Sequence, residues 1–435
     1  MARTTRGDDL LLVRPRVDWQ GDLVTFAHGY RDPAQRPGFF GETLPGDLDG
    51  VLAELGGLEN DLTGGVSQAL ALAVCPVSFP PPLSFEKRSA AFAASSYSAT
   101  GFAVEVGVAE THLANPLFAA FFSEPERTFL AGASLGGIVA LELAERFPDT
   151  YDAALPVCGP VAGSRLQLAY VGHVELLFRT LYPDVFDGGS VEAIDLSEPL
   201  DLPYGDPGAP ADPDGEDTVV ARIAAAVDAD DAGLQAMAEV EVEPLGGARR
   251  PLLQYDPSRP ESLLRSVLDA FYYTAAGKAD VVDLAGGLPF DNRDVTYWLD
   301  GAPLESVPVV TGNAAAGAYF EDHYEPTGEL SVPTVTVHNR YDPVVPAFHE
   351  EVYAGLVANA GRSDQLRTAL VPFESLPSAI GGPAFGHCAF PVEVVAVFGL
   401  LQAWVETGTP PALPAALDVA SELEGWASEG STGDR

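Results

Sequence analysis

One short segment constrains the fold of this chain more than any other. RTFLAGASLGGIVALELAERFPD runs from Arg127 to Asp149 and holds an apolar run, a group of small residues around Ser134, and an amphipathic stretch. Its centre, GASLGG, fits the pattern GxSxG, with Gly132 and Gly136 flanking the serine. A tight strand-to-helix turn requires small residues at those two positions, because larger side chains would collide with the neighbouring strand and helix. Such a turn exposes a nucleophilic serine; the alternative is a glycine-rich turn with an incidental serine.

Strand-like and helix-like segments alternate on both sides of this turn. We expect strands at 10–17, 22–29, 88–98, 127–133, 153–159, 332–343 and 366–373. We expect helices at 52–73, 103–122, 137–147, 348–360 and 392–408. This alternation predicts an α/β fold with a doubly wound, mostly parallel sheet.

A long insertion interrupts the alternation. Residues 163–329 contain mostly helical stretches, separated by acidic segments rich in proline and glycine. We therefore expect one α/β domain in two parts, 1–162 and 330–412, around a mostly helical insertion. Residues 413–435 have the composition of an acidic C-terminal tail.

A serine nucleophile needs a base and an acid that orients the base. In PAFGHCAFP, His387 follows the last expected strand, and in TVTVHNRYDPVVP, Asp342 follows the strand before it. The order Ser, Asp, His is one of the known orders for such triads. The alternatives are His338, at a strand end, and His349, on a helix, as the base, and an Asp-Pro turn role for Asp342.

The reaction also requires N–H donors that bind the developing oxyanion. The backbone N–H of Leu135, directly after the serine, is one candidate. The segment LVTFAHGYRDP offers the other, because Gly29 allows a close turn after an early strand and Tyr30 then donates its N–H. His28 is expected to be a structural residue of that turn.

The composition narrows the binding partners. The chain has 63 acidic and 23 basic residues and a formal net charge of −40, which argues against binding to nucleic acid or anionic lipid. Adaptation to high salt explains such an excess; a merely acidic protein from a GC-rich genome is the alternative. No apolar run is long enough for a membrane span. The short apolar stretch near the start does not suit a signal peptide, so we expect either a cytoplasmic protein or one whose leader has been removed.

These motifs together resemble the α/β-hydrolase superfamily over about the first 160 and the last 100 residues. The matching motifs are HGY, GASLGG, NRYDPVVP and GHCAF, and further stretches are similar to a branch of bacterial esterases and peptidase-like hydrolases. The resemblance implies Ser134 as nucleophile, Asp342 as acid, His387 as base, and Tyr30 and Leu135 as oxyanion donors. It also implies that the insertion covers the site as a lid.

The chain departs from part of this family in its cysteines. Tannase and feruloyl-esterase relatives carry a cysteine before the nucleophile, bridged to one after the catalytic histidine. Here Cys388 follows the histidine, but Ala133 precedes the serine. The resemblance leaves Cys158, at the end of the next strand, as a partner for Cys388; three free thiols, with Cys75, is the alternative.

The leading hypothesis is hydrolysis of a small-molecule or polymeric carboxylic ester through an acyl-enzyme. No Cys/His spacing suits a metal site, and the reaction needs no cofactor. A serine peptidase or aminopeptidase on the same scaffold is the nearest rival, since the triad does not distinguish esters from amides. The third hypothesis is a non-catalytic relative of these enzymes that only binds its ligand. Aromatic residues in FYYTAAG and VTYWLDG fit either a substrate pocket or the core of the lid.

Overall fold

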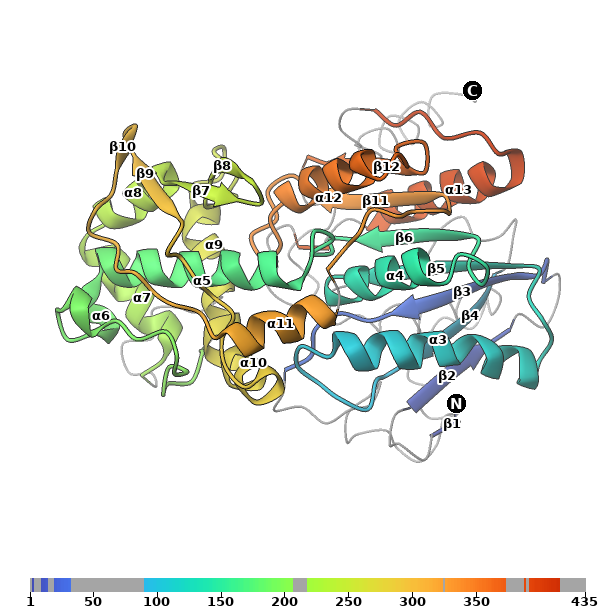
Figure 1. The fold of residues 1–435 in the computed structure, drawn as a ribbon, viewed down its shortest axis with the longest axis horizontal. Helices are drawn as coiled ribbons and strands as arrows, with labels where there is room; N and C mark the ends of the chain where they lie inside the picture. The colour runs from blue at the N-terminus through green and yellow to red at the C-terminus, as the bar shows by residue number, and fades with distance from the viewer. Residues whose placement is uncertain are drawn as a thin grey trace, which may run out of the picture.

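The computed structural model consists of an α/β part and an inserted segment beside it (Figure 1). It describes residues 2–3, 9–14, 19–32, 90–205, 217–323, 325–372, 387–388 and 391–414. The helix predicted at 52–73 and most of the tail at 413–435 lie outside these residues. Within them, no helix has the length and apolar character needed to cross a membrane.

The α/β part is built on an eight-stranded sheet with the order β1-β2-β4-β3-β5-β6-β11-β12. Its strands are β1 (Ala2–Arg3), β2 (Asp9–Val13), β3 (Asp22–Ala27), β4 (Ala91–Ser95), β5 (Arg127–Ala133), β6 (Ala153–Val157), β11 (Thr334–Asn339) and β12 (Leu366–Val371). In this order, neighbouring strands from β4 to β12 are parallel, whereas β1 pairs antiparallel with β2 and β2 pairs antiparallel with β4. The predicted doubly wound, mostly parallel sheet is therefore confirmed.

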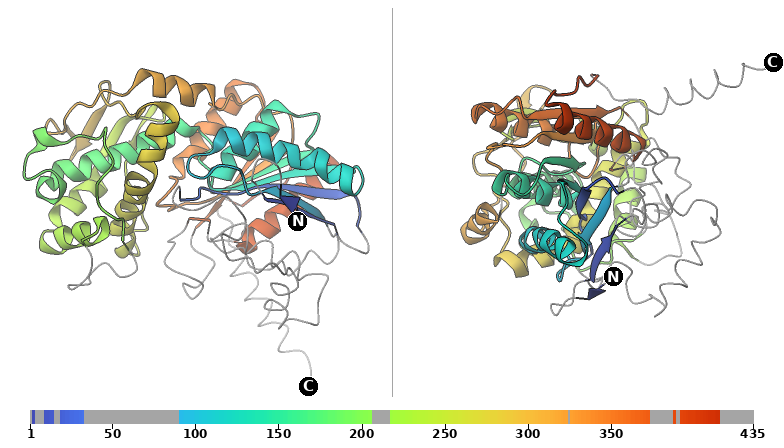
Figure 2. Two further views of the ribbon diagram at one scale, coloured as in Figure 1. Left: turned by 90° about the horizontal axis from the view of Figure 1, so that it is seen from below. Right: turned by 90° about the vertical axis from the view of Figure 1, so that its right-hand side faces the viewer.

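Helices cover both faces of this sheet. They are α3 (Val104–Phe121), α4 (Leu135–Arg146), α12 (Phe348–Asn359) and α13 (Pro391–Thr407). One buried cluster joins strand residues such as Leu130 to α3, α4 and α12, and another joins residues such as Phe129 to α13. Successive residues of β5 thus point to opposite faces, both of them covered. The left view of Figure 2 shows α3 and α13 on opposite sides of the sheet.

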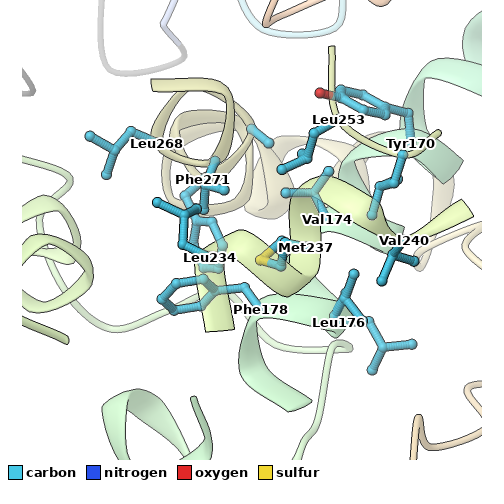
Figure 3. Close-up of a cluster of buried hydrophobic side chains, with 14 of the residues drawn as sticks. Tyr170, Val174, Leu176, Phe178, Leu234, Met237, Val240, Leu253, Leu268 and Phe271 are labelled. Atoms are coloured by element: carbon cyan, nitrogen blue, oxygen red, sulfur yellow. The ribbon is translucent and has the colours of Figure 1, made fainter. Parts of the chain in front are cut away.

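The inserted segment, residues 163–329, leaves the sheet after β6 and returns before β11. Its helices are α5 (Ser164–Leu181), α6 (Pro183–Phe186), a 3₁₀ turn (Val191–Ala193), α7 (Val219–Ala229), α8 (Ala232–Glu239), α9 (Glu261–Tyr272), a π-helical turn (Tyr273–Gly277), α10 (Lys278–Ala285) and α11 (Ala314–Asp322). It has its own buried core around α5, where Phe178 and Met237 lie among leucines, valines and Phe271 (Figure 3). The segment therefore folds around side chains of its own.

A small antiparallel sheet in the inserted segment was not predicted. It has the order β10-β9-β7-β8, with β7 (Glu241–Leu245), β8 (Ala248–Pro251), β9 (Thr296–Leu299) and β10 (Ala302–Pro303). Its strands are short, and β7 and β8 carry charged and proline residues, so no alternation stands out. The two hairpin turns were visible in the sequence, as Gly246-Gly247 and Asp300-Gly301, and all four of these residues have positive φ.

Candidate active site

Ser134 lies on a strained turn between β5 and α4. Its φ of 54° and ψ of −126° fall outside the helical and strand regions, and its N–H donates to the carbonyl of Val157 at 2.9 Å. A Cβ on Gly132 would lie 2.0 Å from the carbonyl oxygen of Gly136, and one on Gly136 would lie 2.1 Å from that of Ala27. The turn therefore has no room for side chains at either position.

His387 connects Ser134 to Asp342. Its Nε2 lies 2.9 Å from Ser134 Oγ, and its Nδ1 lies 2.8 Å from Asp342 Oδ2. The carboxylate accepts a hydrogen bond from Nδ1–H, which leaves Nε2 free to accept one from the serine hydroxyl. His387 is only 7% exposed and Asp342 is fully buried. Three segments far apart in the sequence thus bring the predicted residues into one hydrogen-bonded chain.

Asp342 is held in place by backbone groups as well as by His387. Its Oδ1 accepts from the N–H groups of Val344 and Val345 at 2.9 and 3.0 Å. Burial would raise the pKa of Asp342, but the neighbouring His387 and His338 hold it well below its ordinary value. Asp342 is therefore both a turn residue and the partner of His387, so the two interpretations of the Asp-Pro sequence coexist.

The turn after β3 approaches the serine closely. A Cβ on Gly29 would lie 3.1 Å from Ser134 Cβ, and Tyr30 and Leu135 line the same pocket as the serine. Leu135 is the first residue of α4, where N–H groups lack an acceptor within the helix. Both predicted donor residues thus line the same pocket as Ser134; their binding of an oxyanion stays a prediction.

The other candidate histidines have different partners. His349 Nδ1 accepts from the Ala162 N–H at 3.2 Å, and burial lowers its pKa to about 3. His28 stacks on Tyr97, and burial likewise lowers its pKa to about 3. His338 lies behind Asp342, between that residue and Glu350. Of the four candidate histidines, His387 is the one that the structure places against Ser134.

A disulfide joins Cys158, directly after β6, to Cys388, directly after His387, with their Cα atoms 5.4 Å apart. It ties the histidine to the same end of the sheet as Ser134. The two sulfurs and a His387 nitrogen lie within 4.8 Å of one another, a metal-ligand spacing among the described residues. Because both sulfurs are bonded to each other, neither is a thiolate that binds a metal.

The pocket beside Ser134 continues along α5 into the inserted segment. Its α5 lining is Gln167, Leu168, Val171, Gly172 and Glu175. This face extends about 12 Å, since a helix rises about 1.5 Å per residue. Tyr273, Thr274, Gly277, Lys278 and Val281, from the π-helical turn and α10, also line the pocket. The pocket has a volume of about 80 Å³, and most of its other lining residues are apolar.

A buried ion pair lies in this lining, and sequence analysis missed it. Lys278 Nζ is 2.8 Å from both carboxylate oxygens of Glu175, and Arg179 also donates to Glu175 at 3.0 Å. Lys278 is one of two lysines in the chain, which is the signal that could have singled it out. Of the aromatic residues proposed for the pocket, Tyr273 lines it, whereas Tyr297 belongs to the core of the inserted segment.

Comparison with known proteins gives low similarities. No protein-family model and no curated protein matches the sequence. Solved structures that resemble this one include proline iminopeptidase of Mycobacterium smegmatis, with 12% identity, a TM-score of 0.36, and 93% of this chain and 97% of that chain covered. A ligand-bound rice cell wall degrading esterase of Xanthomonas oryzae has 13% identity, a TM-score of 0.40, and coverages of 91% and 85%. Feruloyl esterase B of Aspergillus oryzae has 12% identity and a TM-score of 0.44, with 94% of this chain and 80% of that chain covered.

At these similarities, the fold assignment rests on the chain itself. The sheet is mostly parallel, the GxSxG serine lies on a strained strand-to-helix turn at the end of β5, and a long segment is inserted after β6. These features are those of the α/β-hydrolase fold, and the chain has that fold.

Proposed function

We propose that this chain is a serine hydrolase that cleaves carboxylic esters through an acyl-enzyme. The observation that carries the proposal is the hydrogen-bonded chain from Asp342 through His387 to Ser134, with distances of 2.8 and 2.9 Å. Each atom in it suits its step: a carboxylate orients the imidazole, and the free imidazole nitrogen faces the hydroxyl.

The first half of the reaction acylates the serine. Ser134 Oγ attacks the ester carbonyl while His387 Nε2 takes its proton, and Asp342 stabilises the resulting imidazolium. The N–H groups of Leu135 and Tyr30 bind the oxyanion. When the carbon–oxygen bond of the ester breaks, His387 returns the proton to the departing alcohol.

The second half releases the acid. His387 takes a proton from water, the hydroxide oxygen attacks the acyl carbon, and the same N–H groups bind the second oxyanion. The bond to Ser134 Oγ then breaks and His387 reprotonates the serine. The free acid leaves and the starting state returns.

The chemistry of the pocket favours an ester over a substrate with a free amine. Gripping an ammonium group needs an available carboxylate, and among the described residues that line the pocket the carboxylate is that of Glu175. Lys278 and Arg179 already pair with it. The apolar residues that make up most of the lining suit the hydrocarbon part of an ester instead.

Hydrolysis of p-nitrophenyl esters from acetate to dodecanoate tests the proposal, with aminoacyl p-nitroanilides measured in parallel at low and at molar NaCl. We expect release of p-nitrophenol from the esters by the wild type. Ser134→Ala should lower the rate by at least about a thousandfold, because the nucleophile is lost while the fold is kept. Ser363→Ala, at an exposed serine, is the matched control and should leave the rate unchanged.

The outcomes separate the three hypotheses. Faster cleavage of the anilides, also dependent on Ser134, would assign the chain to the peptidases. Ester cleavage that survives Ser134→Ala would overturn the nucleophile. Absence of cleavage with every substrate, in a folded protein, would favour the non-catalytic binding relative.

A further inference from the structure

A second histidine lies behind Asp342, and the proposed reaction does not use it. His338 is on β11 and is fully buried. Its Nδ1 is 3.0 Å from Glu350 Oε1, and its Nε2 is 2.8 Å from the carbonyl oxygen of Val345 and 3.4 Å from Asp342 Oδ2. The ring is thus enclosed by two carboxylates and a carbonyl.

These contacts determine the protonation of His338. Both ring nitrogens face oxygens that accept hydrogen bonds, and neither a carbonyl nor an ionised carboxylate donates one. The other oxygen of Glu350 accepts from the Thr336 hydroxyl, so an ionised Glu350 is an acceptor at both oxygens. A neutral imidazole would leave one nitrogen facing an acceptor without a proton. The arrangement is therefore satisfied by an imidazolium.

Electrostatics agrees with this geometry. Burial alone would lower the pKa of His338, but hydrogen bonds to Asp342 and Glu350, together with their charges, raise it to about 10. The imidazolium balances one of two buried carboxylates, which would otherwise repel each other in a site without solvent. Asp342 thus has a cation on one side, His338, and a neutral imidazole, His387, on the other.

We propose that His338 is a buried imidazolium that positions Asp342 and sets the basicity of His387. The inference rests on the proposed function, because it concerns the base of that reaction. A fixed cation beside Asp342 offsets part of its negative charge, so Asp342 stabilises protonated His387 less. His387 then stays neutral, and able to take the serine proton, down to a lower pH.

Other titratable groups near Asp342, His338 and His387 also affect how the charge of this site changes with pH. They are Asp269, Tyr170 and Tyr273 of the inserted segment and His349 of α12. Burial raises the pKa of both tyrosines above an ordinary value of about 10, so they are neutral near pH 7. Asp269 pairs with Arg265 at 2.6 Å, and burial raises its pKa to about 6, so its charge changes within the pH range of the profiles. Asp269→Asn is therefore needed as a background.

The test is a histidine NMR titration combined with pH profiles of kcat/KM for p-nitrophenyl acetate. The variants are Glu350→Gln and the double variant His338→Gln/Glu350→Gln, each with and without Asp269→Asn. The double variant removes one cation and one anion together, so the net charge of the buried cluster is the same as in the wild type. NMR reads the pKa of His387 directly, whether or not the protein cleaves esters.

In the wild type we expect one buried histidine that is still protonated at pH 8, with signals that disappear in the double variant. The pKa of His387 and the acid limb of kcat/KM should rise by about one unit in the double variant. Neither should rise in Glu350→Gln, which keeps the cation. A purely structural role would change the rate without moving either value.

Two results would overturn the proposal: a neutral His338 in the wild type at pH 8, or an unmoved pKa of His387 in the double variant. The NMR measurement of His338 protonation in the wild type tests the proposal even if the double variant does not fold. If His338 is protonated and shifts His387 as expected, but no ester is cleaved, the proposed function fails and the electrostatic coupling stands.

Discussion

Single residues at this site carry more than one role. The Asp342 carboxylate accepts hydrogen bonds from two backbone N–H groups of its turn and, at the same time, from Nδ1–H of His387. Ser134 likewise combines a strained backbone with a hydrogen bond to His387. A substitution at either position therefore tests chemistry only if the local fold survives it.

Asp342→Asn separates the two roles of Asp342. An asparagine oxygen still accepts from Val344 and Val345, but its amide group faces His387 and donates, which forces the proton onto Nε2. With that tautomer, His387 cannot accept from Ser134, so we expect kcat to fall by about ten thousandfold. The measurement is kcat for the best p-nitrophenyl ester, with the exposed Asp149→Asn as control. Near-normal turnover would mean that another carboxylate orients His387.

At the level of strands and helices, two glycines in helices of the α/β part offer a matched comparison. A Cβ added to Gly136, at the start of α4, would lie 2.1 Å from the carbonyl oxygen of Ala27. A Cβ added to Gly355, in α12, would meet open space. The same change to alanine should therefore have opposite effects at the two positions.

We expect Gly136→Ala to destabilise the fold by about 3 kcal/mol or more, because backbone atoms of a neighbouring strand must move. Gly355→Ala should stabilise it by about 0.5–1 kcal/mol, because alanine restricts the unfolded chain more than glycine does. Urea unfolding measures both. Equal effects at the two sites would contradict the close packing of the Ser134 turn.

The sequence was informative for those elements whose pattern is local. Buried strands such as β5 are continuous apolar runs, and the GxSxG turn is a fixed spacing, so the sheet and Ser134 were predictable. The sheet in the inserted segment was missed because its strands are short and two of them, β7 and β8, are charged. The Glu175–Lys278 pair and the environment of His338 depend on contacts between distant segments, which no periodicity reveals.

Across the whole molecule, the net charge of −40 is the dominant property. Many like charges on one surface repel each other in the compact state, and salt screens that repulsion. We therefore predict that the melting temperature rises between 0.1 and about 2 M NaCl. Calorimetry at constant pH measures it, with a sodium sulfate series at matched ionic strength as control for ion-specific effects. A flat or falling melting temperature would argue against adaptation to high salt.

Covalent labelling of the serine tests the central claim most directly. Intact-mass spectrometry after treatment with a fluorophosphonate, followed by peptide mapping, reports which side chain is an activated nucleophile. We predict one adduct per chain, on Ser134, formed rapidly by the wild type, slowly by Asp342→Asn and not at all by Ser134→Ala. A folded wild-type protein that stays unlabelled, or an adduct on another residue, would contradict a Ser134–His387–Asp342 triad.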